Sequence, residues 1–568
     1  MQKLYTPEGA ALSGQPWPEY PRPLLERDSF YNLNGEWEFA AQGAAEIPAV
    51  FPMRIRVPFA PESILSGVER HFARQWLFYR KTFTLVQGFA RSRTFLHFGA
   101  VDQIAEVFLN GVRLGEHRGG YAPFSFEVTE ALQEENTLVV RVRDELQNHV
   151  LPYGKQREKR GGMWYTPVSG IWQTVWLESV GERFIRELNV ETGLDFARID
   201  TGDETLCGTV SVETPQGTLR VPLEKGRARV KLDAPCLWSP QAPYLYRFTV
   251  ETAQDCVRSY FALRALETRV IGGVPRLCLN GKPYFFNGLL DQGYWSDGLF
   301  TPASPSCYAR DILMAKRMGF NMLRKHIKVE PQRFYYECDR LGMIVFQDMV
   351  NNGSYSFLRD TALPTAGLKR LPDRWMHLDR KTRAAFLEGM DETVRLLKRH
   401  PCVCCWTIFN EGWGQFDSGA AYRRLRRLDA TRFIDSASGW FSGGESDVES
   451  RHVYFRPFRF KRGKKPVVLS EFGGYALKLR AYSFNPEKTY GYRNFETQTE
   501  FMDALEKLYR EEILPAIPQG LCAAVYTQLS DVEDEVNGLT TYDRRELKCD
   551  AERMRRIGEE AAQRLLKP

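Results

Sequence analysis

The chain has 568 residues, of which 43% are hydrophobic and 26% charged, so it is a globular protein too long for one compact core, and two to four domains are expected. Its 77 basic and 71 acidic residues leave a net charge of +6, which over this length does not indicate a nucleic-acid partner. No stretch approaches the ~18 uninterrupted apolar residues of a membrane span, and "MQKLYTPEGAALSGQPWPEYP" at the N-terminus has no apolar export core, so a cytoplasmic protein without a membrane partner is expected.

The first 180 residues are predicted to form an antiparallel β-sandwich of the jelly-roll type. They contain short strand-like runs such as "WLFYRKTFTL" (76–85) and "NTLVVRVRD" (136–144), and helical periodicity is scarce. Asn110-Gly111 lies between two alternating runs, and this dipeptide is the strongest short signal for a tight hairpin. We expect a domain over 1–180 of the sugar-binding kind.

The next segment, 181–268, continues as short strands, among them "LYRFTVETA" and "RSYFALRALET". About 90 residues with roughly seven short strands are typical of an immunoglobulin-like sandwich. We therefore expect a second β-domain over 181–268.

From residue 269 to 568 strand-like runs alternate with helical stretches, which predicts βα units and a (β/α)8 TIM barrel. In such a barrel the carboxyl ends of the strands share one mouth, and the chemistry takes place there. The expected strands are 283–290, 321–326, 344–349, 404–410, 432–438, 452–455, 467–473 and 522–529, and the clearest helices are 306–318, 331–341, 380–399 and 498–512.

The eleven cysteines are an odd number scattered among hydrophobic runs, which favours reduced thiols over a disulfide framework. Cys402, Cys404 and Cys405 alternate along an apolar strand, and no second pair with zinc spacing lies near them. Buried structural thiols are the expectation, with no metal.

Two predicted strands have a glutamate at or near their carboxyl end. The fourth, "CCWTIFN", is followed by Glu411, and the seventh, "VVLSEFG", carries Glu471. Strands four and seven face each other across the mouth, and retaining glycosidases use two carboxyl groups ~5–5.5 Å apart, one protonated and one ionised. A single glutamate before glycine also occurs where a strand simply leaves for solvent, but the pair, with Asn410 before the first member, favours catalysis.

The sequence resembles glycoside hydrolase family 2, the group of β-galactosidases, β-glucuronidases and β-mannosidases, over nearly its whole length. The resemblance lies in the order of the three domains and in "VFLNGVRLGEHRGGYAPFSFEVT" (107–129), "TPVSGIWQTVWLE" (166–178), "LWSPQAPYLY" (237–246), "TIFNEG" (407–412) and "LSEFGG" (469–474). It implies hydrolysis by double displacement with retention, Glu411 as acid/base, Glu471 as nucleophile, and Asn410 as the residue that binds the sugar 2-hydroxyl.

Further polar and aromatic residues follow the barrel strands and are candidates for substrate binding. The resemblance implies that Arg324 props the nucleophile, that a nearby histidine touches the sugar and that Tyr454 lies beside the nucleophile. Structural salt bridges, core hydroxyls and packing are the alternatives for these positions. The candidates are Asn410, Arg324, His326, Asp291, Asp348, Tyr454, His452, Trp413 and Trp295.

The sequence also departs from known members of the family. Where β-galactosidases carry an Arg-His pair after the first strand it has Leu290-Asp291-Gln292, and their acidic magnesium segment is replaced by "QDMVNNG". The Asn-x-Lys of β-glucuronidases matches only at 280–282, before the first strand. We expect an exo-acting β-galactosidase-like enzyme without cofactor or metal, acting on an oligosaccharide or glycoside. The alternatives are a uronate-specific enzyme, such as a β-glucuronidase or galacturonidase, and a non-catalytic carbohydrate-binding protein; a homo-oligomer stays open.

The segment 451–466, "RHVYFRPFRFKRGKKP", holds seven Lys or Arg residues interleaved with aromatic ones. Because it follows the sixth strand, we expect this basic segment to overhang the mouth and to contact an anionic or extended substrate. A solvated loop is the alternative.

Overall fold

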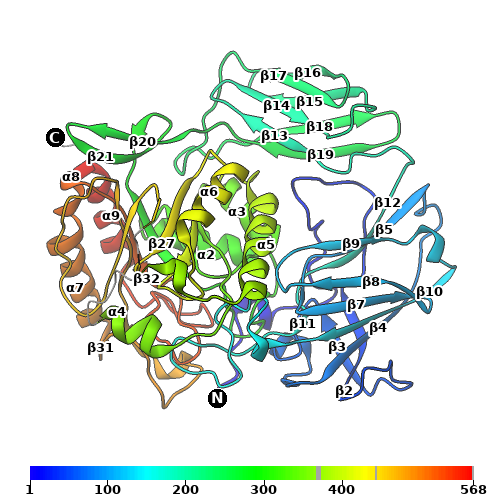
Figure 1. Ribbon diagram of the computed structural model, residues 1–568, viewed down its shortest axis with the longest axis horizontal. Coiled ribbons are helices and arrows are strands. Elements are labelled where there is room, and N and C mark those ends of the chain that lie inside the picture. The colour runs from blue at the N-terminus through cyan, green and yellow to red at the C-terminus, as the bar shows by residue number, and fades with distance from the viewer. Residues whose placement is uncertain (366–371, 442–443, 566–568) are drawn as a thin grey trace.

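The computed structural model describes residues 1–365, 372–441 and 444–565. Figure 1 shows a β-sandwich at the right, a second smaller sandwich at the top and a helix-covered barrel at the left. Within the described residues, no helix has both the length and the apolar character needed to cross a bilayer.

The N-terminal sandwich packs a six-stranded sheet against a four-stranded one. Alternate residues of the strands point inward, and the buried side chains, among them Trp37, Phe39, Tyr79 and Val140, form one core between the sheets. The predicted Asn110-Gly111 hairpin is confirmed: both residues have positive φ, 52° and 82°, and the flanking residues pair. The six-stranded sheet has the order β3 (Met53–Val57), β2 (Gly35–Gln42), β4 (Trp76–Thr84), β10 (Glu135–Arg143), β7 (Ile104–Leu109) and β8 (Val112–Arg118), and the four-stranded sheet β1 (Tyr31–Asn32), β12 (Val175–Val180), β5 (Arg93–Phe98) and β9 (Phe124–Glu127).

The second sandwich has a three-stranded and a four-stranded sheet around its own core, which includes Ile199, Val212, Tyr246 and Phe261. This arrangement is the immunoglobulin-like one expected from the spacing of the strands. The sheets are β13 (Asn189–Thr192), β14 (Phe196–Asp200) and β17 (Arg227–Lys231), and β16 (Gly217–Leu223), β15 (Gly208–Thr214), β18 (Tyr246–Thr252) and β19 (Cys256–Phe261).

A small three-stranded sheet links this domain to the barrel: β20 (Leu266–Ile271), β21 (Val274–Leu279) and β22 (Lys282–Pro283). Arg276 on β21 donates to the carbonyl oxygens of Ile517 and Pro518, just before the last barrel strand. The predicted first barrel strand began at residue 283, but Pro283 pairs with β21, so the barrel strand starts only at Phe286.

The barrel contains the eight parallel strands expected from the sequence. Their hydrogen-bonded order is β27-β26-β25-β24-β23-β32-β29-β28. Every residue of β26 is buried, as is usual for a parallel strand covered on both faces. In chain order the strands are β23 (Phe286–Asp291), β24 (Met322–Lys325), β25 (Ile344–Asp348), β26 (Val403–Asn410), β27 (Phe433–Ser438), β28 (Glu449–Val453), β29 (Val467–Gly473) and β32 (Leu521–Thr527).

Side chains close the ring between β27 and β28, the two ends of the hydrogen-bonded order. Ser450 donates to Asp435, and the Ser438 hydroxyl lies 3.0 Å from Nε2 of His452. The second of these contacts brings His452 toward the mouth, because Ser438 is the last residue of its strand.

The expected helices are present around the barrel. They begin and end within a few residues of the predicted positions; α7, for example, starts at a capping box in which Thr497 and Glu500 bond to each other's backbone N–H groups. The main helices are α2 (Ser306–Arg317), α3 (Gln332–Leu341), α5 (Arg380–Leu397), α6 (Ser418–Leu428), α7 (Gln498–Leu508) and α9 (Ala551–Leu565).

The basic segment 451–466 does not overhang the mouth along its length, which corrects the expectation from sequence. Residues 454–466, which join β28 to β29 and are all described, form no helix, so the chain after Tyr454 must itself return to the other end of the barrel, where β29 begins. Arg451 donates to the carbonyl oxygen of Lys461, and the ring of Phe460 lies by Gly520, immediately before β32. The charged part of the segment therefore runs along the outer wall.

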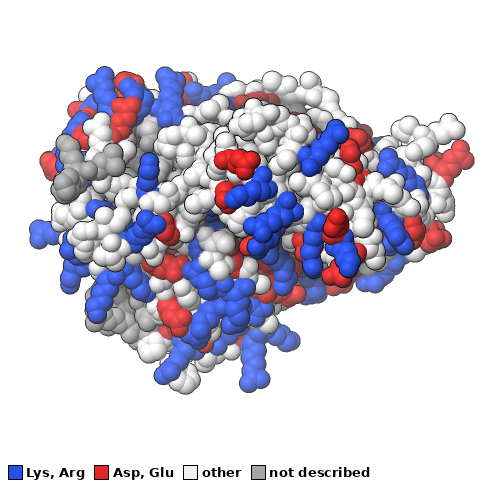
Figure 2. Space-filling model, turned by 90° about the horizontal axis from the view of Figure 1, so that it is seen from above, with Lys and Arg blue, Asp and Glu red and all other residues white. Residues whose placement is uncertain are grey.

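Charges of both signs are interleaved over most of the face that Figure 2 displays. Many charged side chains of the protein pair at its surface; Arg553, for example, contacts both Asp503 and Glu506. Such exposed pairs contribute little stability, about 0–1 kcal/mol each.

Candidate active site

Glu411 stands at the point where β26 ends. It follows Asn410, the last residue of the strand, and its backbone is left-handed, with φ 50°. That conformation is uncommon for a residue with a Cβ and is found disproportionately at functional sites. The Glu411 N–H donates to the carbonyl oxygen of Ser438 at 2.9 Å, so the end of β27 fixes the turn.

Glu471 is held by an irregularity in β29. The parallel register with β28 shifts between Arg451 and His452, so that His452 pairs with Glu471 and Ser470 is bypassed. Bulges of this kind re-aim side chains and are frequent next to active sites. Here the shift places Glu471 and His452 side by side at the mouth.

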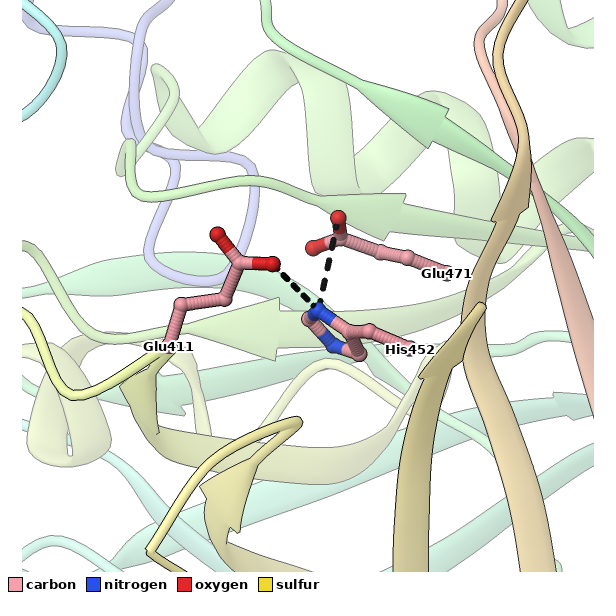
Figure 3. Close-up of side chains that lie close together, drawn as sticks. All are labelled: Glu411, His452 and Glu471. Carbon is pink, nitrogen blue, oxygen red and sulfur yellow. Dashed lines mark hydrogen bonds and ion pairs between the residues drawn. The ribbon is translucent and has the colours of Figure 1, made fainter. Parts of the chain in front are cut away.

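The two carboxyl groups lie close together, with His452 between them (Figure 3). One oxygen of each glutamate and one ring nitrogen of His452 all lie within 4.8 Å of one another. Nδ1 of His452 is 2.8 Å from Oε1 of Glu411 and 3.6 Å from Oε2 of Glu471. This spacing fits the ~5–5.5 Å between the carboxyl groups of retaining glycosidases and not the ~6.5–9.5 Å of inverting ones.

Glu471 is ionised. Burial opposes its charge, but the charge that His452 carries when its ring is protonated, the Arg324 guanidinium and the Tyr454 hydroxyl outweigh burial and lower its pKa to about 2. Arg324 Nη1 donates to Oε1 at 3.0 Å, and the Tyr454 hydroxyl donates to Oε2 at 2.5 Å. Both oxygens of the proposed nucleophile therefore have a donor, as the resemblance implied for Arg324 and Tyr454.

Arg324 organises the floor of the site. Its side chain is 1% exposed and donates to four acceptors: Asp348 Oδ1, the Ser470 carbonyl, Glu471 Oε1 and Asn410 Oδ1. Burial opposes its charge, but the carboxylates of Asp348 and Glu471 raise its pKa further above its ordinary value. Because Arg324 occupies the Asn410 oxygen, the Asn410 amide nitrogen is left to donate elsewhere.

His326 and Asp348 support this floor. His326 Nδ1 lies 2.8 Å from Asp348 Oδ2, while Arg324 binds the other oxygen of the same carboxylate. Burial lowers the pKa of His326 despite Asp348, which favours the neutral ring. Asp348 thus orients two side chains toward the mouth.

A chain of hydroxyl groups orients the ring of His452. The Ser470 hydroxyl donates to the carbonyl oxygen of Arg451, and the Ser438 hydroxyl donates to Ser470. Ser438 therefore offers its lone pairs to His452 Nε2, 3.0 Å away, which places a proton on that nitrogen. In the neutral ring Nδ1 is then an acceptor, and it faces Glu411, so Glu411 in its protonated form has a partner to which it donates.

Two of the predicted site residues lie away from the glutamates. Asp291 accepts from the Lys325 ammonium at 2.6 Å and from the Gly293 N–H at 2.9 Å. Trp295 is 2% exposed and packs against Tyr308 and under Arg544, so it is a packing residue. The observed contacts are thus a structural salt bridge for Asp291 and core packing for Trp295.

Trp413 is buried two residues after Glu411 and stacks on Trp164 with the ring centroids 5.4 Å apart. It is thus both a packing residue and part of the wall beside Glu411. The partner ring belongs to the N-terminal domain, which the sequence did not place at the mouth.

Glu411, His452 and Glu471 also present a spacing that a cation accepts. Glu471 already receives Arg324 and Tyr454, and Glu411 already faces His452. The trio therefore has the donors and acceptors of an acid–base site.

Three domain models match consecutive parts of the chain. A galactose-binding domain-like model of glycosyl hydrolase 2 matches residues 58–201, a model of glycosyl hydrolases family 2 matches 190–264, and the family 2 TIM barrel domain matches 274–474. The chain belongs to glycoside hydrolase family 2. This confirms the resemblance seen in the sequence and the three-domain fold class.

Individual relatives in family 2 are distant. A β-galactosidase of Thermoanaerobacter pseudethanolicus is 23% identical over 62% of this chain and 47% of its own length, so the chain spans about half of that relative. A β-glucuronidase of Felis catus is 24% identical over 73% of this chain and 68% of its own length. The solved structure of a β-D-glucuronidase from Dictyoglomus thermophilum has a TM-score of 0.72 at 18% identity, covering 97% of this chain and 99% of that one, which shows a shared fold.

Sequence reasoning missed a segment of the N-terminal domain that lies against the barrel of this family 2 chain. Residues 151–166, here called the arm, are coloured cyan in Figure 1. At one end Tyr153 donates from N to the Asn351 carbonyl and from its hydroxyl to the Gly353 carbonyl. At the other end the Thr166 N–H donates to Glu533 at 2.9 Å. The arm is therefore fastened to the loops after β25 and after β32.

The arm brings Lys155 and Trp164 to the site. Its sequence, "LPYGKQREKRGGMWYT", combines bases and aromatic rings, which was the available signal, but contact with the barrel depends on tertiary structure. Tyr492, from the stretch between β29 and α7, was also missed; its ring stacks on Tyr454 with the centroids 4.1 Å apart. It covers the tyrosine that binds the nucleophile.

Proposed function

We propose that this chain is an exo-acting retaining β-glycosidase that removes a terminal non-reducing sugar by double displacement. The observation that carries the proposal is the pair of carboxyl groups within 4.8 Å whose surroundings differ. Glu471 is ionised between Arg324 and Tyr454, whereas Glu411 faces a histidine nitrogen that accepts a proton. One acid and one nucleophile are what a retaining mechanism needs.

In the first step Glu411 donates its proton to the glycosidic oxygen while an oxygen of Glu471 attacks the anomeric carbon. The carbon–oxygen bond to the aglycone breaks, the aglycone leaves as an alcohol, and the sugar becomes an ester of Glu471. Arg324 and Tyr454 keep Glu471 ionised before the attack and hold its carboxylate in place.

In the second step Glu411, now a carboxylate, removes a proton from water, and the resulting hydroxide attacks the same anomeric carbon. The ester bond breaks and Glu471 leaves as a carboxylate. Two inversions give net retention, and Glu411 is protonated again.

Asn410 has the geometry to bind a sugar hydroxyl. Arg324 Nη2 donates to its Oδ1 at 2.8 Å, which fixes the amide with its nitrogen available as a donor. The family resemblance implies that this donor meets the 2-hydroxyl, where hydrogen bonds strengthen in the transition state. A non-catalytic sugar-binding protein on this scaffold would not require Glu411 and Glu471, or the arginine, Arg324, that stabilises the ionised form of Glu471.

The sugar has two candidates within this proposal. A relative named β-galactosidase supports a β-galactoside, and a relative named β-glucuronidase supports a β-uronide about as well. A cytoplasmic location and a homo-oligomeric state also stay proposals, to be tested by cell fractionation and analytical ultracentrifugation.

A panel of p-nitrophenyl glycosides tests the function. It should include both anomers of galactose, glucose, mannose, glucuronate, galacturonate and arabinopyranose. We expect release of nitrophenol from β-anomers, and loss of that release in Glu411→Gln and Glu471→Gln. Hydrolysis that persists in each of the two single variants, or that is confined to α-anomers, would refute the proposal.

A further inference from the structure

Lys155 is a buried cation at the mouth that the mechanism above does not use. The residue is 7% exposed and lies on the arm, between the two attachment points to the barrel. Its ammonium is 4.9 Å from the ring centroid of Trp413 and 5.9 Å from that of Tyr165. Trp413 is two residues after the proposed acid Glu411, so Lys155 stands beside the catalytic groups.

Lys155 differs from the other buried lysines of the described chain. Lys325 donates to Asp291 and Glu330, Lys328 donates to Glu330, and Lys548 donates to Asp531. Within the described ranges, no carboxylate lies at ion-pair distance from the Lys155 ammonium, whose recorded contacts are the two aromatic faces. Buried charges are normally paired, because an unpaired one loses its hydration without compensation.

Charged groups from several sides of the mouth act on Lys155. Burial lowers its pKa, the carboxylates of Glu535, Glu471 and Glu411 oppose that shift, and Arg324 adds to it. Lys155 in turn lowers the pKa of His326, although burial is the larger cause there. These groups come from the ends of β24, β26 and β29 and from the loop after β32, so Lys155 faces the space they enclose.

The neighbouring acids are already engaged with other partners. Tyr165 and Asn537 donate to Glu535, Arg324 and Tyr454 donate to Glu471, and His452 contacts Glu411. Lys155 is therefore a donor of three protons that projects toward the mouth and has no acceptor of its own among the residues that the structure describes.

We propose that Lys155 binds the carboxylate of a uronic acid seated at the cleaved bond, so that the substrate class is a β-linked uronide. The inference rests on the proposed glycosidase function and extends it to the sugar. A substrate carboxylate supplies the missing acceptor and balances the charge, whereas the hydroxymethyl group of a neutral hexose leaves the ammonium uncompensated. The aromatic faces of Trp413 and Tyr165 exclude water from the pair and strengthen it.

A competing role for Lys155 is to act as a fixed positive charge that positions the catalytic glutamates. That role affects every substrate alike, because Glu411 and Glu471 serve them all. Paired substrates that differ only at C6 separate the two roles: glucuronide against glucoside, and galacturonide against galactoside.

The test measures kcat/KM on these four p-nitrophenyl β-glycosides for Lys155→Met, Lys155→Arg and the wild type. Lys159→Met is the matched control, since Lys159 lies on the same arm but is exposed. We expect the wild type to prefer one of the uronides to its neutral partner. Lys155→Met should lower kcat/KM for that uronide about 10- to 100-fold, the range for one hydrogen bond between charged groups, and alter the neutral partner by less than about threefold. Lys155→Arg should retain more uronide activity than Lys155→Met.

Equal losses on acidic and neutral partners, or a wild type that prefers both neutral sugars, would overturn the inference while leaving the glycosidase proposal intact. If the wild type cleaves another β-glycoside of the panel but none of these four, the inference is overturned and the glycosidase proposal stands. If it cleaves no glycoside of the panel, the function proposal is at fault, and calorimetry with free glucuronate and galacturonate then tests Lys155 directly. Binding that is lost in Lys155→Met and kept in Lys159→Met supports the inference; binding unaffected by Lys155→Met, or absent from the wild type, contradicts it. Thermal unfolding of each variant identifies losses caused by misfolding.

Discussion

Removing the hydroxyl group of Tyr454 should shift the acidic limb of the pH profile of kcat/KM to higher pH. Tyr454 donates to Glu471 Oε2 at 2.5 Å, and Arg324 binds the other oxygen at 3.0 Å. Glu471 has a pKa of about 2, so the wild-type nucleophile stays ionised as the pH falls to that value. A hydrogen bond to a charged group contributes about 1.5–3 kcal/mol, and one pKa unit corresponds to about 1.4 kcal/mol. Tyr454→Phe should therefore raise the pKa of Glu471 by about one to two units.

The sign follows from the charge that is stabilised. The hydroxyl favours the carboxylate, so its removal favours the protonated form, which cannot attack the anomeric carbon. The limb of kcat/KM on the acidic side should move upward to about pH 3–4, since that parameter reports ionisation in the free enzyme. Arg324 remains in the variant, so activity near neutral pH is reduced but present.

The assay is a short initial-rate measurement from pH 2.5 to 7 with an aryl glycoside. Samples returned to pH 6 after the same exposure to acid provide the control for unfolding. An acidic limb that stays in place in Tyr454→Phe, with full recovery at pH 6, would show that this hydroxyl does not set the ionisation of the nucleophile.

Three further predictions concern the same mouth and its surroundings. Glu471→Ala should lower turnover by several orders of magnitude, and azide should restore part of it as a glycosyl azide of inverted configuration, seen by NMR; near-wild-type rates would exclude the nucleophile role. Glu411→Ala should slow substrates with poor leaving groups far more than dinitrophenyl glycosides, since only the former need the acid, and azide should here give the retained product; equal loss on both substrate types would contradict an acid role. Replacing Arg456, Arg459 and Arg462 together by glutamine should change kcat/KM by less than about twofold, because the basic segment runs along the outer wall. This should hold for acidic and neutral substrates at low and high salt. A salt-dependent loss confined to acidic substrates would show that the basic segment contacts the substrate at the mouth.

Much of the fold follows from local pattern. Alternation of apolar residues and the Asn110-Gly111 dipeptide place the strands and the first hairpin, because each is specified within a few residues. The eight barrel strands are predicted from strand-like runs that alternate with helical stretches, and the two glutamates follow from the rule that parallel strands carry chemistry at their carboxyl ends.

Side-chain direction explains why Asp291 pairs with Lys325 and not with the groups around the two glutamates. Arg324 points into the barrel, so the next residue, Lys325, points outward, and Asp291 is the register partner of Lys325. Side chains along a strand point alternately to its two faces, and this alternation can be read from the sequence. Which of the two alternating sets faces the barrel interior depends on the register between β23 and β24. Register across the sheet is set by tertiary packing.

The contribution of the arm was beyond local pattern for a related reason. Lys155 and Trp413 are far apart in sequence and meet only because Tyr153 and Thr166 attach the arm to barrel loops. The basic segment was misplaced because the sixth connection lacks a helix, so the segment itself has to span the length of the barrel. Both cases involve connections between elements, where sequence periodicity gives little information.

The central claim is that Glu471 forms a covalent bond to the sugar. The most direct measurement is mass spectrometry of the protein after reaction with a 2-deoxy-2-fluoro-β-glycosyl fluoride of the preferred sugar, which slows hydrolysis of the ester. The account predicts a gain of one fluoroglycosyl unit on the peptide that carries Glu471, and no label in Glu471→Gln. A label on another residue would contradict it, as would an unlabelled enzyme that turns the same reagent over to a product of inverted configuration.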